Sequence, residues 1–146
     1  RIYQHVWRDK KNGGNLYKYL RHGRKKYNKR SAKNAGRGCI PGRIDIDERP
    51  KIVDEKHRIG DWELDTIIGK DHHGAIVSMV DRASKFTKLM LVPNKTAEAV
   101  TSAITISLGP LKPFVLTMTA DNGKEFAAHD ELKKALGAQV YFAKPY

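Results

Sequence analysis

The spacing of apolar residues changes between residues 60 and 143, and this change limits the possible folds more than any other feature of the sequence. In the first part, three β-rich runs are separated by short turn-forming segments, a pattern that predicts an antiparallel meander. After Pro93 the apolar residues Val100, Ile104 and Leu108 recur at helical spacing, which predicts that strands then alternate with helices. The expected strands are 62–69, 75–80, 86–92, 114–119 and 140–143, and the expected helices are 96–108 and 124–136.

This βββαβαβ order predicts an α/β domain with a mixed sheet. Because crossover connections between parallel strands are right-handed, the fourth strand (114–119) is expected beside the first (62–69) and parallel to it. The last residues of these two strands then lie at the same edge of the sheet. A length of 146 residues is enough for one domain with a buried core and an extension.

Positive charge is concentrated in the first third of the chain. Residues 1–50 contain 15 Lys and Arg against 4 Asp and Glu, whereas residues 51–146 contain 13 against 12. We therefore expect a basic arm over 1–50 and a globular core over 51–146. Such an arm gains free energy by releasing counterions from DNA or RNA, and the alternative is a solvated tail without a partner. The residues best suited to contact phosphates are Arg24, Lys25, Lys26, Lys29 and Arg30.

Within this arm, residues 1–22 have a helical pattern that Gly13-Gly14 interrupts, and residues 24–42 are typical of a flexible linker. Cys39 is the sole cysteine, which excludes an internal disulfide and fits a reducing, intracellular compartment. No residues have the spacing of zinc ligands. The longest apolar runs are too short to span a bilayer, and residues 1–11 do not have the pattern of a secretory signal.

Asp65 lies inside the first expected strand, near the centre of the sheet. A buried carboxylate without a partner would cost roughly several kcal/mol, so its charge requires compensation. Two interpretations remain open at this point. One is a salt bridge or hydrogen bond with a nearby Lys, Arg or Thr, and the other is a divalent cation.

Asp121 follows the fourth expected strand and precedes Asn122-Gly123, a pattern that is also common in turns and at helix N-termini. If the first and fourth strands are neighbours, Asp65 and Asp121 approach each other at one edge of the sheet. Two like charges in contact repel unless a cation lies between them. Oxygen ligands without nearby His or Cys suit Mg²⁺ or Mn²⁺, and ions held in this way support phosphoryl displacement.

The remaining charged residues of the core are expected to be structural or exposed. Asp81, at a strand end, is expected to cap a turn or form a surface pair, and Glu63 is expected to be exposed or ion-paired. Glu125 and Glu131 are expected to face solvent. Lys124, beside Asp121, could contact a phosphate or could be an ordinary surface lysine.

Three segments of the core resemble the catalytic core of insertion-sequence transposases of the IS-thirty family. They are GDWELDTIIGK at 60–70, PNKT at 93–96 and TADNGKEF at 119–126, and the YFAKPY segment at 141–146 resembles the part that follows in those proteins. The pairing of a W-E-x-D motif with a D-N-G-x-E-F motif carries the resemblance. More broadly, the pattern is similar to that of retroviral integrases.

The resemblance implies a ribonuclease-H-like fold and a DDE active site that uses two divalent ions, Mg²⁺ or Mn²⁺, to cut and join DNA. Asp65 and Asp121 match the first two acids of that site, in catalytic and metal-binding roles. The implied partners are the ends of a mobile element and the target DNA, with no membrane. A homo-oligomer is implied for the active complex, in the bacterial cytoplasm near the nucleoid.

The family's third acid is a Glu on a helix beyond the last matched strand, and no residue of this sequence aligns with it. We therefore expect weak metal binding and little or no strand transfer from the chain as it stands. Two other functions remain open: a non-catalytic DNA-binding module on a degenerate scaffold, and a ribonuclease-H-type nuclease acting on RNA–DNA hybrids, since the fold alone does not fix the substrate.

Overall fold

The computed structural model describes residues 2–20 and 40–144, and the chain divides into two compact units, Arg1–Arg37 and Gly38–Tyr146. In the first unit, helix α1 (Ile2–Lys11) ends just before Gly13, whose φ of 84° is left-handed, and a 3₁₀ turn follows at Leu16–Tyr19. The backbone N–H of Leu16 donates to the Asp9 carboxylate at 3.0 Å, which ties the turn to the helix. The predicted interruption at Gly13-Gly14 is therefore confirmed.

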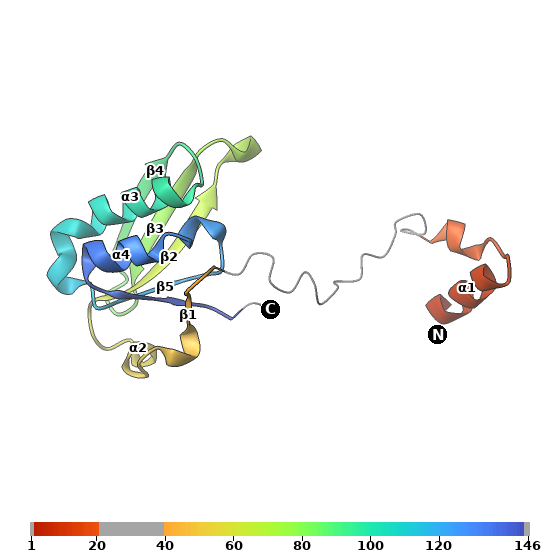
Figure 1. Ribbon diagram of the computed structural model, residues 1–146, viewed down its shortest axis with the longest axis horizontal. Helices are drawn as coiled ribbons and strands as arrows, with labels where there is room; N and C mark the ends of the chain where they lie inside the picture. Colours follow the sequence, from red (N-terminus) through yellow and green to blue (C-terminus); the bar gives the residue numbers. More distant parts are fainter. Residues whose placement is uncertain (1, 21–39, 145–146) are drawn as a thin grey trace. The chain divides into compact units, whose positions relative to one another are not determined.

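The second unit is built on a six-stranded mixed sheet with the strand order β1-β6-β5-β2-β3-β4 (Figure 1). The expected βββαβαβ order is confirmed from β2 onwards, and β5 is parallel to β2 and beside it, as the crossover argument predicted. The strands are β1 (Ile44–Asp45), β2 (Asp61–Ile68), β3 (Ala75–Asp81), β4 (Thr87–Val92), β5 (Thr117–Ala120) and β6 (Gln139–Phe142), and the longer helices are α3 (Ala97–Leu108) and α4 (His129–Leu136).

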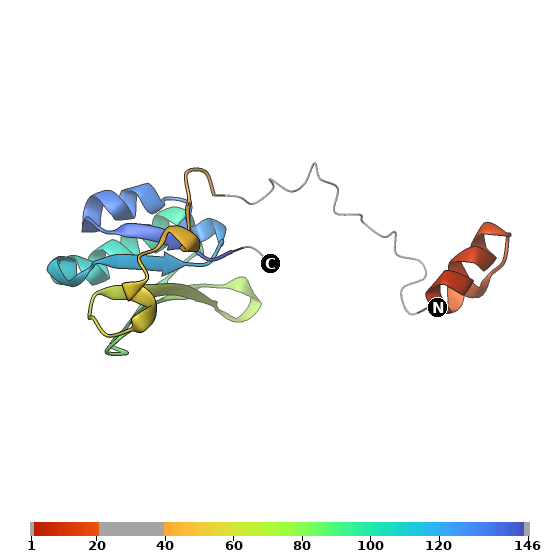
Figure 2. The ribbon, with the colours of Figure 1, turned by 90° about the horizontal axis from the view of Figure 1, so that it is seen from below.

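One face of the sheet forms the apolar core. Alternation along β2 turns Trp62 and Leu64 to this face, where Leu64 pairs with Met79 of β3 on one side and with Ala120 of β5 on the other. Helices α3 and α4 lie on the same side of the sheet (Figures 1 and 2) and contribute Ile104 and other apolar residues to this core. Glu63 lies between these two buried positions and Asp65 follows Leu64, so both side chains are on the opposite face, where both are exposed.

The core begins before residue 51, where the charge distribution had placed its start. Ile40 is 4% exposed and belongs to the apolar cluster, and β1 pairs in parallel with β6 at the edge of the sheet. The short helix α2 (Ile52–Glu55) buries Val53 completely. The boundary was misplaced because a two-residue strand among charged residues has no recognisable period.

Two other elements differ from the sequence prediction. The fourth core strand is shorter than 114–119, because Gly109–Phe114 forms a 3₁₀ turn containing Pro110 and Pro113, which have no backbone N–H to donate to a ladder. The expected helix 124–136 is divided into a 3₁₀ turn, Lys124–Phe126, and α4. The left-handed cap at Gly137 ends α4 where it was predicted. Within the described residues, every helix is too short or too polar to cross a membrane.

Candidate active site at the ends of β2 and β5

The register between β2 and β5 places Asp65 and Asp121 side by side. Leu64 and Ala120 form the last pair of this parallel ladder, and Asp65 and Asp121 are the next residues along the two chains. Backbones of neighbouring strands lie about 5 Å apart, so the two carboxylates occupy the same edge of the sheet. The approach predicted from the strand order is therefore present in the structure.

Both carboxylates are exposed and are held by local backbone hydrogen bonds. The N–H of Thr66 donates to Oδ1 of Asp65 at 2.7 Å, and the N–H of Gly123 donates to Oδ1 of Asp121 at 2.8 Å. The second contact is the turn that the Asp-Asn-Gly sequence predicted. The expectation that Asp65 is buried was wrong, because Leu64 takes the inward position and alternation turns Asp65 outward.

Within the described residues, no cationic side chain neutralises the charge of Asp65 or Asp121 through an ion pair. No ion pair within 4.0 Å there involves Asp65 or Asp121. The salt-bridge interpretation of Asp65 therefore has no support in the part of the chain that the structure describes, whereas a hydrogen bond with a threonine is present, from the backbone N–H of Thr66. What remains is a pair of oxygen donors on an open face, and such donors suit a hard divalent cation.

The two donors do not form a complete metal site by themselves. Over residues 2–20 and 40–144, no group of three or more His, Cys, Asp or Glu is placed to hold a metal ion. The expectation of weak metal binding stays a prediction. The donor set is thus compatible with Mg²⁺ or Mn²⁺ in its chemistry and incomplete in its number of ligands.

The loop after β5 is fixed by the residue that follows Asp121. Arg43 donates from Nη1 to the side-chain oxygen of Asn122, and Asn122 donates from Nδ2 to the carbonyl of Ala143. These contacts join the loop to the segment before β1 and to the end of β6. Arg43 could not be predicted from the sequence, because it lies 79 residues from Asn122 and no local pattern marks it.

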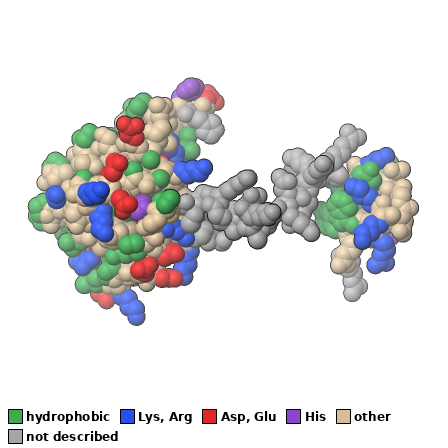
Figure 3. All heavy atoms as spheres, viewed as in Figure 1, with side chains coloured by type: hydrophobic (Ala, Val, Ile, Leu, Met, Phe, Trp, Pro, Cys, Tyr) green, Lys and Arg blue, Asp and Glu red, His purple; other side chains and the backbone are tan. Residues whose placement is uncertain are grey.

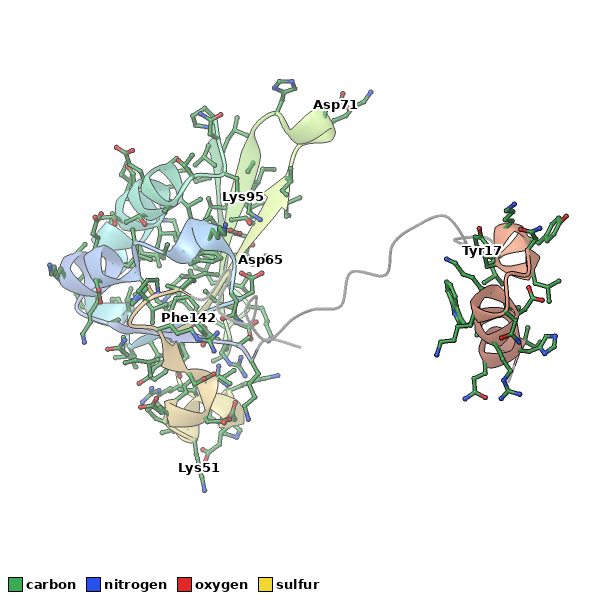
Figure 4. All side chains as sticks on the ribbon, turned by 45° about the vertical axis from the view of Figure 1, so that its right-hand side comes forward. Tyr17, Lys51, Asp65, Asp71, Lys95 and Phe142 are labelled. Carbon is green, nitrogen blue, oxygen red and sulfur yellow. The ribbon has the colours of Figure 1, made fainter. Side chains whose placement is uncertain are left out.

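Among the residues of the site, Glu125 differs most from its predicted exposure. It was expected to face solvent, but it is 6% exposed, because the 3₁₀ turn after Gly123 directs it inward where a regular helix would have left it outside. Its Oε1 accepts a hydrogen bond from the Thr66 hydroxyl at 2.9 Å and lies 2.7 Å from Nζ of Lys95. Figure 4 labels Lys95, from the connection between β4 and α3, and Asp65, from β2.

The electrostatic surroundings of Glu125 favour its charged form. Burial by itself would raise its pKa, but the hydrogen bonds from Lys95, from its own backbone N–H and from Thr66 outweigh burial and hold the pKa below 4.5, its ordinary value. The Lys95 side chain is 31% exposed, so the pair lies at the border of the core. The only sequence signal for this contact was Lys95 itself, in the PNKT segment.

The other acidic residues are structural, as expected. Asp81 accepts hydrogen bonds from the backbone N–H of Gly60 and from Ser84, so it caps a turn, although it is buried and does not lie on the surface. Glu63 is exposed and paired with Arg82. Glu131 is exposed on α4, which confirms that prediction.

The candidate DNA contacts divide into two groups. Lys124 is exposed, three residues after Asp121, and its side chain is available to a ligand at this edge. The other five candidates lie outside the described residues: Arg24, Lys25, Lys26, Lys29 and Arg30.

Comparison with known proteins gives no matching family model but several similar sequences. The transposase for insertion sequence element IS4351 of Bacteroides fragilis is 51% identical over 145 residues, which is 99% of this chain. The transposase InsI for element IS30C of Escherichia coli K12 is 33% identical over 130 residues, or 86% of this chain. By sequence, the chain is similar to the IS30-type insertion-sequence transposases over most of its own length. It spans 44% of the length of the first of these transposases and 32% of the second.

One solved structure shows a similar fold. A chain of the simian T-cell lymphotropic virus intasome in complex with PP2A regulatory subunit B56 gamma superposes with a TM-score of 0.53 at 16% identity, over 61% of this chain and 33% of that one. The catalytic core domain of BIV integrase is 28% identical, with a TM-score of 0.47, over 59% of this chain and 55% of that one. The second unit thus has the ribonuclease-H-like α/β fold that the sequence motifs implied.

Proposed function

We propose that this chain forms part of the catalytic core of a DNA transposase, a polynucleotidyl transferase that cuts and joins DNA at the ends of a mobile element. The observation that carries the proposal is the shared edge of Asp65 and Asp121, on neighbouring parallel strands with open access from solvent. Similarity to transposases along 99% of the chain supports this enzyme class over a DNA-binding module alone.

Asp65 and Asp121 would hold the divalent ions, in company with an acid that this sequence does not supply. A bound Mg²⁺ or Mn²⁺ would provide the Lewis acidity for phosphodiester displacement. The two backbone hydrogen bonds, from Thr66 and Gly123, orient one oxygen of each carboxylate before any ligand arrives. In the first reaction the oxygen of water bonds to phosphorus and the P–O3′ bond breaks, which frees a 3′-hydroxyl. In the second reaction that hydroxyl loses its proton and bonds to a phosphorus of the target strand, whose own P–O3′ bond breaks and leaves a 3′-hydroxyl on the target.

DNA is the proposed partner, held by phosphate contacts from the basic arm and from Lys124. These contacts position a strand without reading its sequence. We further propose that the active complex is a homo-oligomer and that it works in the bacterial cytoplasm, associated with the nucleoid. The described helices provide no membrane span.

Mn²⁺ binding by the chain as it stands tests the metal site, because it needs no third acid to give a signal. Electron paramagnetic resonance of free Mn²⁺ measures the bound fraction. We expect weak binding that Asp65→Asn or Asp121→Asn removes, with little change in affinity for duplex DNA. Glu131→Gln is the control, because Glu131 is exposed on α4 and this substitution removes one negative charge away from the site. Equal Mn²⁺ binding by the Asp65→Asn/Asp121→Asn double variant and the unmodified chain would refute the site.

Reaction assays separate the transposase from a ribonuclease-H-type nuclease. With Mg²⁺ and element-end DNA, we expect this chain to give little or no strand transfer, because two carboxylates leave the ions incompletely held. Joining at the rate of a complete transposase would show that the two acids suffice and would contradict this account of the site. Cleavage of RNA–DNA hybrids in preference to duplex DNA would favour the nuclease.

A further inference from the structure

The buried carboxylate of Glu125 joins three segments that meet behind the candidate site. Glu125 itself is on the 3₁₀ turn after β5, Thr66 is near the end of β2, and Lys95 is in the connection between β4 and α3. The contact with Thr66 spans 59 residues and the contact with Lys95 spans 30, so neither follows from local chain geometry. Glu125 thus connects these three segments through its own position in the turn, its hydrogen bond with Thr66 and its ion pair with Lys95.

The hydrogen bond between Thr66 and Glu125 lies beyond the last paired residues of β2 and β5. The β2–β5 ladder ends at Leu64 and Ala120, and the backbone carbonyl of Ala120 accepts from Ala143, on the β6 side. Asp65 and Asp121 come one residue beyond the last pair. Like charges on neighbouring strands repel each other. The side-chain hydrogen bond from Thr66, the residue after Asp65, to Glu125 connects β2 with the turn that follows Asp121.

Gly123 provides the space for this link. Its φ is −63°, which any residue can adopt, so the backbone does not require glycine. A Cβ at this position would lie 2.4 Å from Oε2 and 2.5 Å from Cδ of Glu125, inside the volume that the carboxyl group occupies. The same glycine donates its N–H to Asp121. Gly123 therefore donates its N–H to Asp121, and the absence of a Cβ at this position leaves room for the carboxyl group of Glu125.

We propose that Glu125 is a positioning residue that sets the spacing of Asp65 and Asp121, through its bond to Thr66, for a divalent cation. This inference rests on the proposed function, because it assigns a role to Glu125 only if the two aspartates bind metal. Residues that orient metal ligands typically change metal affinity about 10- to 100-fold when they are replaced. Glu125 reaches the ligands through Thr66 on one strand and through the Asp121–Glu125 turn on the other.

A matched pair of substitutions at Thr66 tests the proposal without removing a buried charge. Thr66→Val keeps the shape and loses the hydroxyl donor, whereas Thr66→Ser keeps the donor and loses the methyl group. Mn²⁺ affinity is measured for each by electron paramagnetic resonance, with Asp65→Asn and Glu131→Gln as controls, and folding is checked by urea unfolding without metal. We expect Thr66→Val to weaken Mn²⁺ binding on the order of 10-fold and Thr66→Ser to bind nearly as the unmodified chain does.

Gly123→Ala provides a second variant, which displaces the Glu125 carboxylate without changing Thr66 or Lys95. We expect it to lower Mn²⁺ affinity as much as Glu125→Ala does, and the double variant Gly123→Ala/Glu125→Ala to lower it no further. A further loss in the double variant would show that the added methyl group acts on Asp121 directly and would contradict the steric account of Gly123.

The outcomes distinguish this proposal from the proposed function. If Asp65→Asn removes Mn²⁺ binding but Thr66→Val leaves it unchanged, the positioning role is overturned and the metal site stands. Equal weakening by Thr66→Val and Thr66→Ser would assign the effect to packing of the threonine and would also overturn it. If the unmodified chain does not bind Mn²⁺, the metal site fails and the positioning role fails with it.

Discussion

Asp61 is a buried acid at the start of β2 whose charge stabilises the fold. Arg58 donates two hydrogen bonds to its carboxylate, at 2.8 and 2.9 Å, and Thr117 donates a third at 2.6 Å. Burial by itself would raise the pKa of Asp61, but the hydrogen bonds from Arg58 and Thr117, together with the charge of Arg58, hold the pKa below 3.8, its ordinary value. Asp61 is four residues from Asp65 and belongs to the scaffold of the same strand.

This lowered pKa predicts acid destabilisation. Because the folded pKa is lower than the unfolded one, the contribution of Asp61 to stability is present above about pH 4 and is lost as the pH falls through the folded pKa. Asp61→Asn should lower the free energy of unfolding near pH 7 by about 2 kcal/mol, reduced from the fully buried case because Arg58 is 33% exposed. It should also flatten the fall of stability with pH below about 4. Urea unfolding between pH 2 and 7 measures both effects, and an unchanged pH profile would contradict the assignment.

Single residues show what the sequence could and could not reveal about the site. Asp65 and Asp121 were predictable because the strand order alone puts their strands side by side. The buried role of Glu125 was not predictable, since it depends on a 3₁₀ turn in place of the first turn of a helix. Asp65 was expected to be buried because its strand is central in the sheet, whereas alternation turns it to an exposed position on the face opposite Trp62 and Leu64.

Among the helices and strands, α4 ends in a way that requires glycine. Gly137 has a φ of 76°, and its backbone N–H donates to the carbonyl of Lys133 at 2.8 Å. A Cβ there would meet only Lys112 at 3.8 Å, an ordinary contact. The requirement for glycine is therefore conformational and not steric, in contrast to Gly123.

Two substitutions at Gly137 measure this requirement. Gly137→Ala should lower the free energy of unfolding by about 1 kcal/mol, because left-handed backbone is costly for residues with a Cβ. Gly137→Asn should cost less, since asparagine adopts this conformation more readily. Thermal or urea unfolding gives the comparison. Equal stability of the alanine variant and the unmodified chain would show that the helix end relaxes into another conformation.

The elements predicted from spacing were correct where the periodicity was long. The β2–β3–β4 meander and α3 follow from regular alternation and helical spacing. The N-cap of α3 is Thr96, whose hydroxyl accepts from the backbone N–H of Ala99. The two residues of β1 and the four of α2 are too short to show a period. These short elements are held by long-range contacts with β6 and with the turn after β3, which sequence spacing does not show.

At the scale of the whole molecule, charge follows the boundary between the two compact units. Residues 1–37 contain 13 Lys and Arg against one acid, whereas residues 38–146 contain 15 of each sign. Figure 3 shows acidic and basic side chains interspersed on the visible face of the core. The long-range attraction of this chain for a polyanion therefore comes from its first unit.

This distribution predicts the salt dependence of DNA binding. Changing Arg24, Lys25, Lys26, Lys29 and Arg30 to Gln should weaken binding to duplex DNA of any sequence and reduce the slope of log affinity against log salt by up to about 4.5. Fluorescence anisotropy at several salt concentrations measures the slope. Lys133→Gln/Lys134→Gln, on the exposed side of α4, is the control and should leave it nearly unchanged. An unaltered slope in the five-residue variant would place the DNA contacts elsewhere.

The register between β2 and β5 has a consequence for how this chain can vary. Leu64 and Asp65 are consecutive and face opposite sides of the sheet. Inserting or deleting one residue within β2 would bring an acid into the interior and expose leucine to water. The strand can therefore tolerate exchanges of amino acid but not changes in length, and additional residues can be accommodated only in the turns on either side of it.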